Sequence, residues 1–501
     1  MRSALLVGTL VGAGMIGGGA WACSSSSSSG GGGGGGDAGD GSFTFQPQGC
    51  GYAVFAPATR ALTDFATNDT AAADAASAAP VRVRLGLGGG TSLGKSGYAD
   101  PSTTAAFTWE TAGATRGAKV KLGADPSALT DAHAGFSFTL PPPAVGLGAN
   151  EASSNMHEVH VCGLAPGKTY YYQVGGGVAG AEVWSATQSF TTVPTSGKVT
   201  IGLLGDSRDS VDTWQLAQLR MRDAGVNIQL ISGDLVDIGT LEALYVRALD
   251  AAWKDPKDGS KFITLGQQMM VPIAGNHENE AARFYGNFAI PGDGPYAETF
   301  ASFSVGGAHV VMLDDQAIAL DTGGDPQAAA QLAWLDQDLA TANGDRAAHP
   351  FVMVVSHRGL YSTSKHGTDP DVLQSRAKLA PLFDKYKVDL VVNGHDHEFE
   401  RSKPLKPGAD PGGAPIVQAS AVDGTTYLIS AGAGADPYDV GVTTVDFREK
   451  STKFGNGTPF VGVYSIASID GKTMTVTTYG MKLAGGGVAG DEVLDTLTLT
   501  H

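Results

Sequence analysis

Cysteine is scarce in this 501-residue sequence, and its three cysteines, Cys23, Cys50 and Cys162, include no C-x-x-C pair. Structural zinc sites draw their ligands from such closely spaced pairs, so a zinc knuckle is excluded. Positive charge is also in short supply: 33 lysines and arginines face 50 aspartates and glutamates, giving a formal net charge of −17. Because an acidic surface repels the phosphate backbone of nucleic acids, a DNA or RNA polymer is excluded as a partner.

The bulk composition is that of a folded protein with more than one domain. Hydrophobic residues make up 42% and aromatic residues 8% of the chain, which is enough to build cores. A length of 501 residues exceeds what one hydrophobic core usually serves, so we expect two domains. Glycine is over-represented, since its 71 residues are roughly twice the usual share of about 7%.

Residues 1–22 have the layout of a signal peptide. Arg2 supplies the positive charge, and the apolar stretch after it is too short and too rich in glycine for a stable membrane-spanning helix. Serines and then glycines fill most of residues 23–42, which we interpret as a flexible tether. The small residues leading up to Cys23 resemble a bacterial lipoprotein cleavage site, from which Trp21 departs.

The lipoprotein resemblance implies a lipid anchor at Cys23, a membrane partner, and a place in the bacterial cell envelope at the outer membrane or cell surface. An ordinary cleaved signal peptide, with Cys23 incidental, is the alternative. Export places Cys50 and Cys162 in an oxidising compartment, where they could form a disulfide. The sequence does not give their separation in space, so this pairing stays open. Residues 43–79 are an N-terminal extension.

Residues 80–195 are predicted to form an all-β sandwich. Short alternating segments follow one another without helices between them, at 81–85, 106–111, 119–123, 157–161, 170–174 and 188–192. Trp109 on an early strand and the L-x-P-G turn at 164–167, ahead of a tyrosine-bearing strand, resemble a fibronectin type III-like domain. His157 and His160 fall on opposite faces of one strand, so we expect them at pairing or surface positions without a functional role.

Residues 196–501 are predicted to be an α/β domain that carries the chemistry. Five times an apolar run that fits a buried strand is followed within a few residues by an aspartate, asparagine or histidine. The runs and the residues after them are 199–204 with Asp206, 228–232 with Asp234, 269–274 with Asn276, 351–356 with His357, and 388–393 with His395 and His397. Because loops at the carboxyl ends of strands meet in one crevice, we expect these side chains to converge.

Carboxylate, amide and imidazole donors in one cleft suit manganese, iron or zinc. A single histidine of this kind would more often be structural, whereas five such strand ends indicate an active site. In order, G-D, G-D-x-x-D, G-N-H-E, H and G-H-x-H resemble the calcineurin-like metallophosphoesterase superfamily. Residues 393–401, 357–362 and 331–335 resemble its purple acid phosphatase branch, with a fibronectin type III-like domain ahead of the catalytic one.

This resemblance implies a two-sheet sandwich flanked by helices, and a centre of two divalent or trivalent metal ions: iron, manganese or zinc. Asp234 would bridge the ions. The second ion would be bound by Asp234, Asn276, His357 and His395, and the first by Asp206, Asp234 and His397. The substrate would be a small phosphate ester, with His277 beside the leaving oxygen. His366 is either a substrate contact or a surface histidine.

Two positions depart from the resemblance. Arg208 stands where the superfamily has a histidine ligand, and Asp237 stands where the purple branch has a tyrosine ligand. A guanidinium cannot ligate a cation, so we expect Arg208 to point at the phosphate. Asp237 either completes the shell of the first ion or stabilises its loop.

Three functions remain in view. The first is an acid-phosphatase-like phosphomonoesterase outside the cytoplasm. The second is a phosphodiesterase of nucleotides or lipid head groups. The third is a surface-binding lipoprotein with a degenerate phosphatase domain. The lost ligand at position 208 keeps this third function open, and the six intact motif residues argue against it: Asp234, Asn276, His277, His357, His395 and His397. The sequence predicts no oligomeric state.

Overall fold

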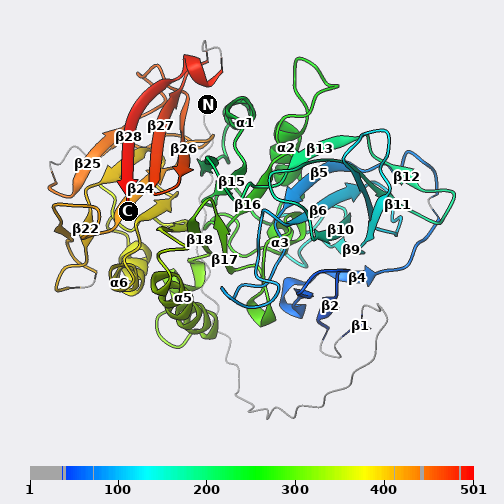
Figure 1. Cartoon of the computed structure of the whole chain (residues 1–501), viewed down its shortest axis with the longest axis horizontal. Helices are drawn as coiled ribbons and strands as arrows, with labels where there is room; N and C mark the ends of the chain where they lie inside the picture. Colours follow the sequence, from blue (N-terminus) through cyan, green and yellow to red (C-terminus); the bar gives the residue numbers. More distant parts are fainter. Residues whose placement is uncertain (1–35, 38–40, 72, 411, 441–444, 484–486) are drawn as a thin grey trace. The chain divides into compact units, whose positions relative to one another are not determined.

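A computed structural model describes residues 36–37, 41–71, 73–410, 412–440, 445–483 and 487–501. The expected signal peptide, the anchor at Cys23 and most of the tether lie outside these residues, so they stay predictions. Within the described ranges, no helix is both long and apolar enough to cross a lipid bilayer. The chain is coloured from its N-terminus to its C-terminus in Figure 1.

The first part of the chain forms an all-β sandwich of two antiparallel sheets (Figure 1). One sheet has the order β4-β9-β10-β6-β5, and the other has the order β12-β11-β7-β8, with β13 paired to β11. The strands are β4 (Thr63–Ala66), β5 (Val81–Gly86), β6 (Thr104–Thr111), β7 (Lys119–Gly123), β8 (Asp131–Ala134), β9 (Phe136–Leu140), β10 (Ser154–Cys162), β11 (Thr169–Gly176), β12 (Val183–Trp184) and β13 (Gln188–Thr191). Phe107, Trp109 and Tyr172 lie in its core.

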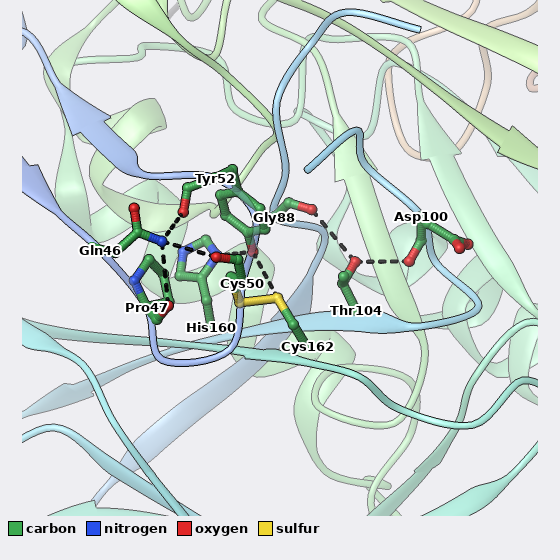
Figure 2. The surroundings of a disulfide bond; sticks show 9 residues. All are labelled: Gln46, Pro47, Cys50, Tyr52, Gly88, Asp100, Thr104, His160 and Cys162. Carbon is green, nitrogen blue, oxygen red and sulfur yellow. Dashed lines mark hydrogen bonds between the residues drawn. A yellow bond between two sulfur atoms is a disulfide. The ribbon is translucent and has the colours of Figure 1, made fainter. Parts of the chain in front are cut away.

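The N-terminal extension is built into this sandwich. Its strands β2 (Phe43–Phe45) and β3 (Val54–Ala56) form a small sheet with β1 (Gly36–Asp37), which lies within the predicted tether. The short 3-10 helix η1 (Ala58–Arg60) follows, and β4 pairs with β9. A disulfide joins Cys50 to Cys162, two residues 112 positions apart, at the end of β10 (Figure 2). The side-chain amide of Gln46 donates to the carbonyl oxygen of Cys50 at 2.9 Å and to that of Tyr52 at 2.7 Å. The pairing that the sequence left open is therefore present in the structure.

His157 and His160 point to opposite faces of β10, but the expectation of a surface position is wrong: they are 2% and 4% exposed. The ring of His157 lies against Trp109 in the sandwich core, with a centroid distance of 5.2 Å. His160 lies on the other face, where its Nδ1 is 2.9 Å from the hydroxyl of Tyr52. The N-terminal extension covers this second face, which a period-2 pattern alone would leave to solvent.

The second part of the chain is a two-sheet α/β domain, which confirms the predicted fold class. One sheet has the order β16-β15-β14-β26-β27-β28, and the other has the order β17-β18-β19-β20-β24-β21-β25. The strands are β14 (Val199–Leu204), β15 (Ile228–Ile231), β16 (Met269–Pro272), β17 (Phe300–Val305), β18 (Ala308–Leu313), β19 (Phe351–Ser356), β20 (Leu390–Asn393), β21 (Phe399–Ser402), β24 (Thr426–Ser430), β25 (Arg448–Thr452), β26 (Gly462–Asp470), β27 (Thr473–Met481) and β28 (Glu492–Thr500). Strands β22 (Leu405–Lys406) and β23 (Ile416–Val417) form a separate ribbon.

Helices flank the two sheets. They are α1 (Val211–Ala224), α2 (Glu242–Trp253), α3 (Ala282–Asn287), α4 (Gln316–Leu320), α5 (Pro326–Gly344) and α6 (Pro370–Lys385), with short 3-10 turns η2 (Gly294–Tyr296) and η3 (Val488–Gly490). Helix α1 begins at Ser210, whose hydroxyl accepts from the backbone N–H of Thr213, and ends at Gly225 in the left-handed region. Leucines of α5 and α6 bury against β19, forming one core with Val352 and Val354.

Parallel pairing places the functional loops at one edge of each sheet. Strands β14, β15 and β16 run parallel to one another, and so do β18, β19, β20 and β24. The carboxyl ends of neighbouring parallel strands lie side by side, so the loops that follow them are brought together.

Candidate metal centre

The structure brings the predicted ligands together. The carboxylate of Asp234 after β15 lies 3.4 Å from Nε2 of His357 after β19. The same imidazole nitrogen is 2.9 Å from the side-chain oxygen of Asn276. Oδ1 of Asp206 is 3.5 Å from Nε2 of His397 and accepts from the backbone N–H of His395 at 3.0 Å. The roles of these side chains as ligands stay predictions.

Tight loops hold these donors. Asp206, Asp234 and His395 have φ values of 57°, 53° and 72°, in the left-handed region that non-glycine residues rarely adopt. Such conformations cost about 1–3 kcal/mol each and are concentrated at functional sites. Two glycines let the loops pack closely: a Cβ on Gly275 would lie 2.2 Å from Oδ1 of Asp234, and one on Gly394 would lie 2.5 Å from Oδ2 of Asp206.

Asp206, Asp234 and His397 form a buried cluster whose ligand atoms all lie within 4.8 Å of one another. Nδ1 of His397 donates to the carbonyl oxygen of Asp436 at 2.6 Å. Because that bond places the proton on Nδ1, the lone pair of Nε2 faces the two carboxylates. Two carboxylates and one imidazole lone pair make a donor set suited to a cation.

The imidazole of His357 in the second donor set is oriented in the same way. Nδ1 of His357 donates to the carbonyl oxygen of Ser232 at 2.8 Å, which directs its Nε2 at the oxygens of Asn276 and Asp234. A cation held between these three atoms would replace a proton on Nε2. Burial acts to lower the pKa of His357, but the carboxylates of Asp234 and Asp206 outweigh it and raise that pKa.

His395 completes this second set. Its Nε2 is buried and has no hydrogen-bond partner among the described residues. Burial lowers the pKa of His395 well below its usual value, which keeps the ring neutral and able to ligate. An orphaned buried imidazole nitrogen costs folding free energy unless a ligand occupies it, so the chain fits an ion here as well.

Glu278 is a residue of this centre whose role the sequence did not reveal. It is 1% exposed, and its carboxylate accepts from the backbone N–H groups of Asp234, Val236 and Gly275 at 2.8–3.0 Å. Burial, and then the charge of Asp234, raise the pKa of Glu278 to about 7. Glu278 ties the loops after β15 and β16 together, and its place in the G-N-H-E motif was the available signal.

Arg208 lies inside the first donor set. Its Nη1 donates to Oδ1 of Asp237 at 2.7 Å, and its Nε is 3.7 Å from Oδ2 of Asp234. Its Nη2 is 3.5 Å from Nε2 of His397. Asp237, with a side chain 47% exposed, is the partner of Arg208 in this structure and lies outside the buried cluster.

His277 lies half-buried at the edge of the centre. Its backbone N–H donates to Oδ1 of Asp234 at 3.0 Å, and its Nδ1 donates to the carbonyl oxygen of Asp237 at 2.7 Å. Nε2 of the ring is 3.9 Å from Oδ2 of Asp234. The ring is therefore held at the carboxylate of Asp234 with Nε2 directed toward it.

His366 reaches the same centre from the loop after β19. Its ring centroid lies 4.3 Å from that of His395, and its Nδ1 is 2.7 Å from a carboxylate oxygen of Asp369. His366 is therefore not an isolated surface histidine, which was one of the two alternatives for this residue. Whether His366 contacts substrate stays a prediction.

Tyr438 is a second residue that sequence reasoning missed. Its ring stacks on His397 with a centroid distance of 4.0 Å and an interplanar angle of 16°. The ammonium of Lys365 lies 4.3 Å from the centroid of the same ring. No motif surrounds Tyr438 in the sequence, and it reaches the centre only through the loop between β24 and β25.

Comparison with known proteins agrees with this geometry. Residues 200–399 match the calcineurin-like phosphoesterase family, and residues 96–192 match the N-terminal domain of purple acid phosphatases. The chain therefore contains a calcineurin-like phosphoesterase domain and a domain similar to the N-terminal domain of purple acid phosphatases. The purple acid phosphatase family uses binuclear centres of iron, zinc or manganese, and the donors around Asp234 fit such a centre.

Three relatives match different shares of the chain. An uncharacterised protein of Mycobacterium tuberculosis is 33% identical over 187 residues, which are 33% of this chain and 35% of that protein. Human acid phosphatase type 7 is 24% identical over 387 residues, covering 72% of this chain and 80% of that protein. Purple acid phosphatase 21 of Arabidopsis thaliana is 30% identical over 276 residues, covering 52% and 56%. The chain thus spans about a third of the mycobacterial relative.

Solved structures share the fold. Purple acid phosphatase PPD1 from yellow lupin seeds superposes with a TM-score of 0.64 at 16% identity, covering 84% of this chain and 74% of that chain. A structure of PhoD superposes with a TM-score of 0.52 at 10% identity, covering 84% and 93%. The purple acid phosphatase architecture therefore extends over most of the described residues.

Proposed function

We propose that this chain hydrolyses small phosphate esters as a phosphomonoesterase of the acid phosphatase type. The observation that carries the proposal is the pair of donor sets that share Asp234. Asp206 and His397 form one set with that carboxylate, and the donors of the second set are Asn276, His357 and His395. Acid phosphatases among the relatives support the monoester substrate class.

The residues of the centre would have different roles in phosphate ester hydrolysis. Two metal ions held by these donors supply charge for the phosphoryl oxygens and activate a water. Since Nδ1 of His277 donates to a backbone carbonyl, its Nε2 is the atom that gives a proton to the leaving oxygen when the ring is protonated. His366, packed beside His395, is placed to contact the ester.

The proposed setting is the bacterial cell envelope, with the protein exported and anchored through a lipid at Cys23. The signal-like residues 1–22 and the Ser/Gly tether support export. The disulfide between Cys50 and Cys162 supports an oxidising compartment. A phosphatase standing on a flexible tether would meet phosphate esters outside the cytoplasm.

The experiment that tests the proposal couples metal analysis with phosphate release. The purified full chain is loaded with manganese, zinc or iron, and hydrolysis of nitrophenyl phosphate is compared with that of bis-nitrophenyl phosphate. We expect two ions per chain and faster release from the monoester. Faster hydrolysis of the diester would replace the proposal by a phosphodiesterase. Failure of every metal form on both esters would support a binding protein with a degenerate domain.

A further inference from the structure

The guanidinium of Arg208 lies close to two of the three donors in the cluster of Asp206, Asp234 and His397. It approaches Asp234 at 3.7 Å and His397 at 3.5 Å, and the side chain is only 12% exposed. A guanidinium stays charged in proteins, so a permanent positive charge stands at one of the two donor sets.

In the described part of the chain, no lysine or arginine forms an ion pair or hydrogen bond with Asn276, His357 or His395. Arg358 is the nearby arginine, and its guanidinium is bonded to Asp315 at 2.8 Å and to Asp371 at 2.8 Å, neither of which is a donor of the centre. Arg208, in contrast, reaches the donors Asp234 and His397 themselves. Its charge therefore opposes a metal ion at the Asp206 and His397 side of Asp234 more than at the Asn276, His357 and His395 side.

Arg208 also has unused hydrogen-bonding capacity. Its Nε is buried and has no acceptor among the described residues, while Nη1 is bonded to the half-exposed carboxylate of Asp237. A guanidinium presents its N–H groups in a planar fork that matches phosphate oxygens. An oxyanion arriving at the centre would satisfy the orphaned N–H and draw the positive charge away from Asp234 and His397.

We propose that Arg208 makes the two metal sites unequal and couples the weaker one to phosphate. The Asn276, His357 and His395 side binds its ion tightly in all conditions. The Asp206 and His397 side binds its ion firmly only when the guanidinium has turned onto a phosphate group, so substrate and second ion bind cooperatively. This inference rests on the proposed function for the identity of the anion.

Metal titration of the metal-free full chain tests the proposal directly. Mn²⁺ is titrated by calorimetry with and without saturating inorganic phosphate, and electron paramagnetic resonance distinguishes isolated from paired Mn²⁺. In the unmodified chain we expect two affinities about 100-fold apart, as a guanidinium charge a few ångströms from an ion implies. Phosphate should bring the two Mn²⁺ affinities to within about tenfold of each other. It should also produce the electron paramagnetic resonance signal of paired Mn²⁺.

Substitutions at position 208 separate charge from shape. Arg208→Leu should give two affinities within about tenfold of each other, with or without phosphate. Arg208→Lys keeps the charge without the fork, so it should keep unequal affinities and lose most of the phosphate coupling. The matched control is Arg247→Leu: this exposed arginine donates to the backbone carbonyl of Arg208 at 3.3 Å and has no hydrogen bond or ion pair with a donor of the centre in the described structure. Its loss should leave both affinities unchanged.

The outcomes that overturn the inference are distinct from those that overturn the proposed function. Two equal Mn²⁺ affinities in the unmodified chain would refute it, as would unequal affinities that persist in Arg208→Leu. If the leucine variant fails to fold, an Arg208→Lys chain that keeps full phosphate coupling refutes the role of the fork. Ester hydrolysis is measured on the same samples. Unequal, phosphate-coupled affinities without any hydrolysis would refute the phosphatase function and leave the inference intact.

Discussion

Asp234 is the side chain on which both donor sets depend. Its two carboxylate oxygens face His357 on one side and Arg208 and His277 on the other. Asp234→Asn keeps the size of the side chain and removes its charge, so both ions lose their shared charged ligand. We expect the variant to bind neither ion and to have no measurable turnover.

Elemental analysis and phosphate release check this prediction. Asp212→Asn, an exposed aspartate in the first turn of α1, is the matched control and should retain both metal content and activity. Two ions per chain in the Asp234→Asn variant would show that this residue does not bridge them.

His277 is the second residue whose role can be measured alone. His277→Ala removes the ring at Asp234 and leaves the proposed ligands in place, so metal content should stay near normal. Hydrolysis should slow by about 10²–10⁴-fold, the usual size of a general acid contribution. The loss should be smaller for nitrophenyl phosphate than for an alkyl phosphate, because nitrophenolate leaves without needing a proton. Equal losses on both esters would argue against proton donation.

At the scale of elements, the turn between β18 and α4 carries a buried acid. Asp314 is 1% exposed and accepts from the hydroxyl of Tyr285 at 3.1 Å and from the backbone N–H of Gln316 at 3.0 Å. Burial, and then the charge of Glu280, raise the pKa of Asp314 to about 8. An acid whose pKa is higher in the folded state holds its proton there over a pH range in which the unfolded chain has lost it.

The sign of the effect follows from this difference. The folded chain binds the proton of Asp314 more tightly than the unfolded chain does. Asp314 therefore lowers the free energy of unfolding more and more as the pH rises from about 4, its pKa in the unfolded chain, to about 8, its pKa in the folded chain. Asp314→Asn cannot ionise and should raise the melting temperature at pH 8 by about 2–4 °C, corresponding to ~1 kcal/mol. The gain should become small at pH 4, where the folded residue is protonated and the unfolded residue is about half protonated. A gain of equal size at both pH values would contradict this account.

At the scale of the whole molecule, the disulfide ties the N-terminal extension to the sandwich. The bridge from Cys50 to Cys162 spans 112 positions, and closing a loop of that length reduces the entropy of the unfolded chain. Replacing both cysteines by alanine should lower the free energy of unfolding by about 2–4 kcal/mol. Phosphate release below the melting temperature should be retained, since no ligand of the centre contacts the bridge in the described structure.

Thermal denaturation with and without reductant measures this effect. Reductant should lower the melting temperature of the unmodified chain toward that of the double variant and leave the double variant unchanged. A reductant effect of the same size in both proteins would mean that the bridge is not its cause.

The proposed anchor is also a property of the whole chain. Cys23→Ser removes the thiol to which a lipid would be attached, so the protein should move from the membrane fraction to the soluble fraction. Its phosphatase activity should not change, because the Ser/Gly tether isolates the anchor point from the folded domains. Immunoblots of fractionated cells measure the distribution, and an unchanged membrane fraction would refute the lipoprotein hypothesis.

The sequence by itself determined the strands of the catalytic domain and the donors at their ends. Apolar runs such as 199–204 and 351–356 became β14 and β19 with the expected bounds, because local pattern and burial agree in strands covered on both faces. Parallel strands expose their carboxyl ends on one edge. The convergence of Asp206, Asp234 and His357 followed from chain order and topology alone.

Tertiary structure decided what no local pattern encodes. The burial of His160 depends on an extension that packs over β10 from about 100 positions away in the sequence, and the disulfide depends on the same contact. Tyr438 reaches His397 through a loop without a motif. The position of Arg208 depends on Asp237 and Asp234, because a long flexible side chain settles where the summed charge around it is most negative. The sequence predicts which residues are the donors, but only the folded chain shows which charged side chains lie next to them.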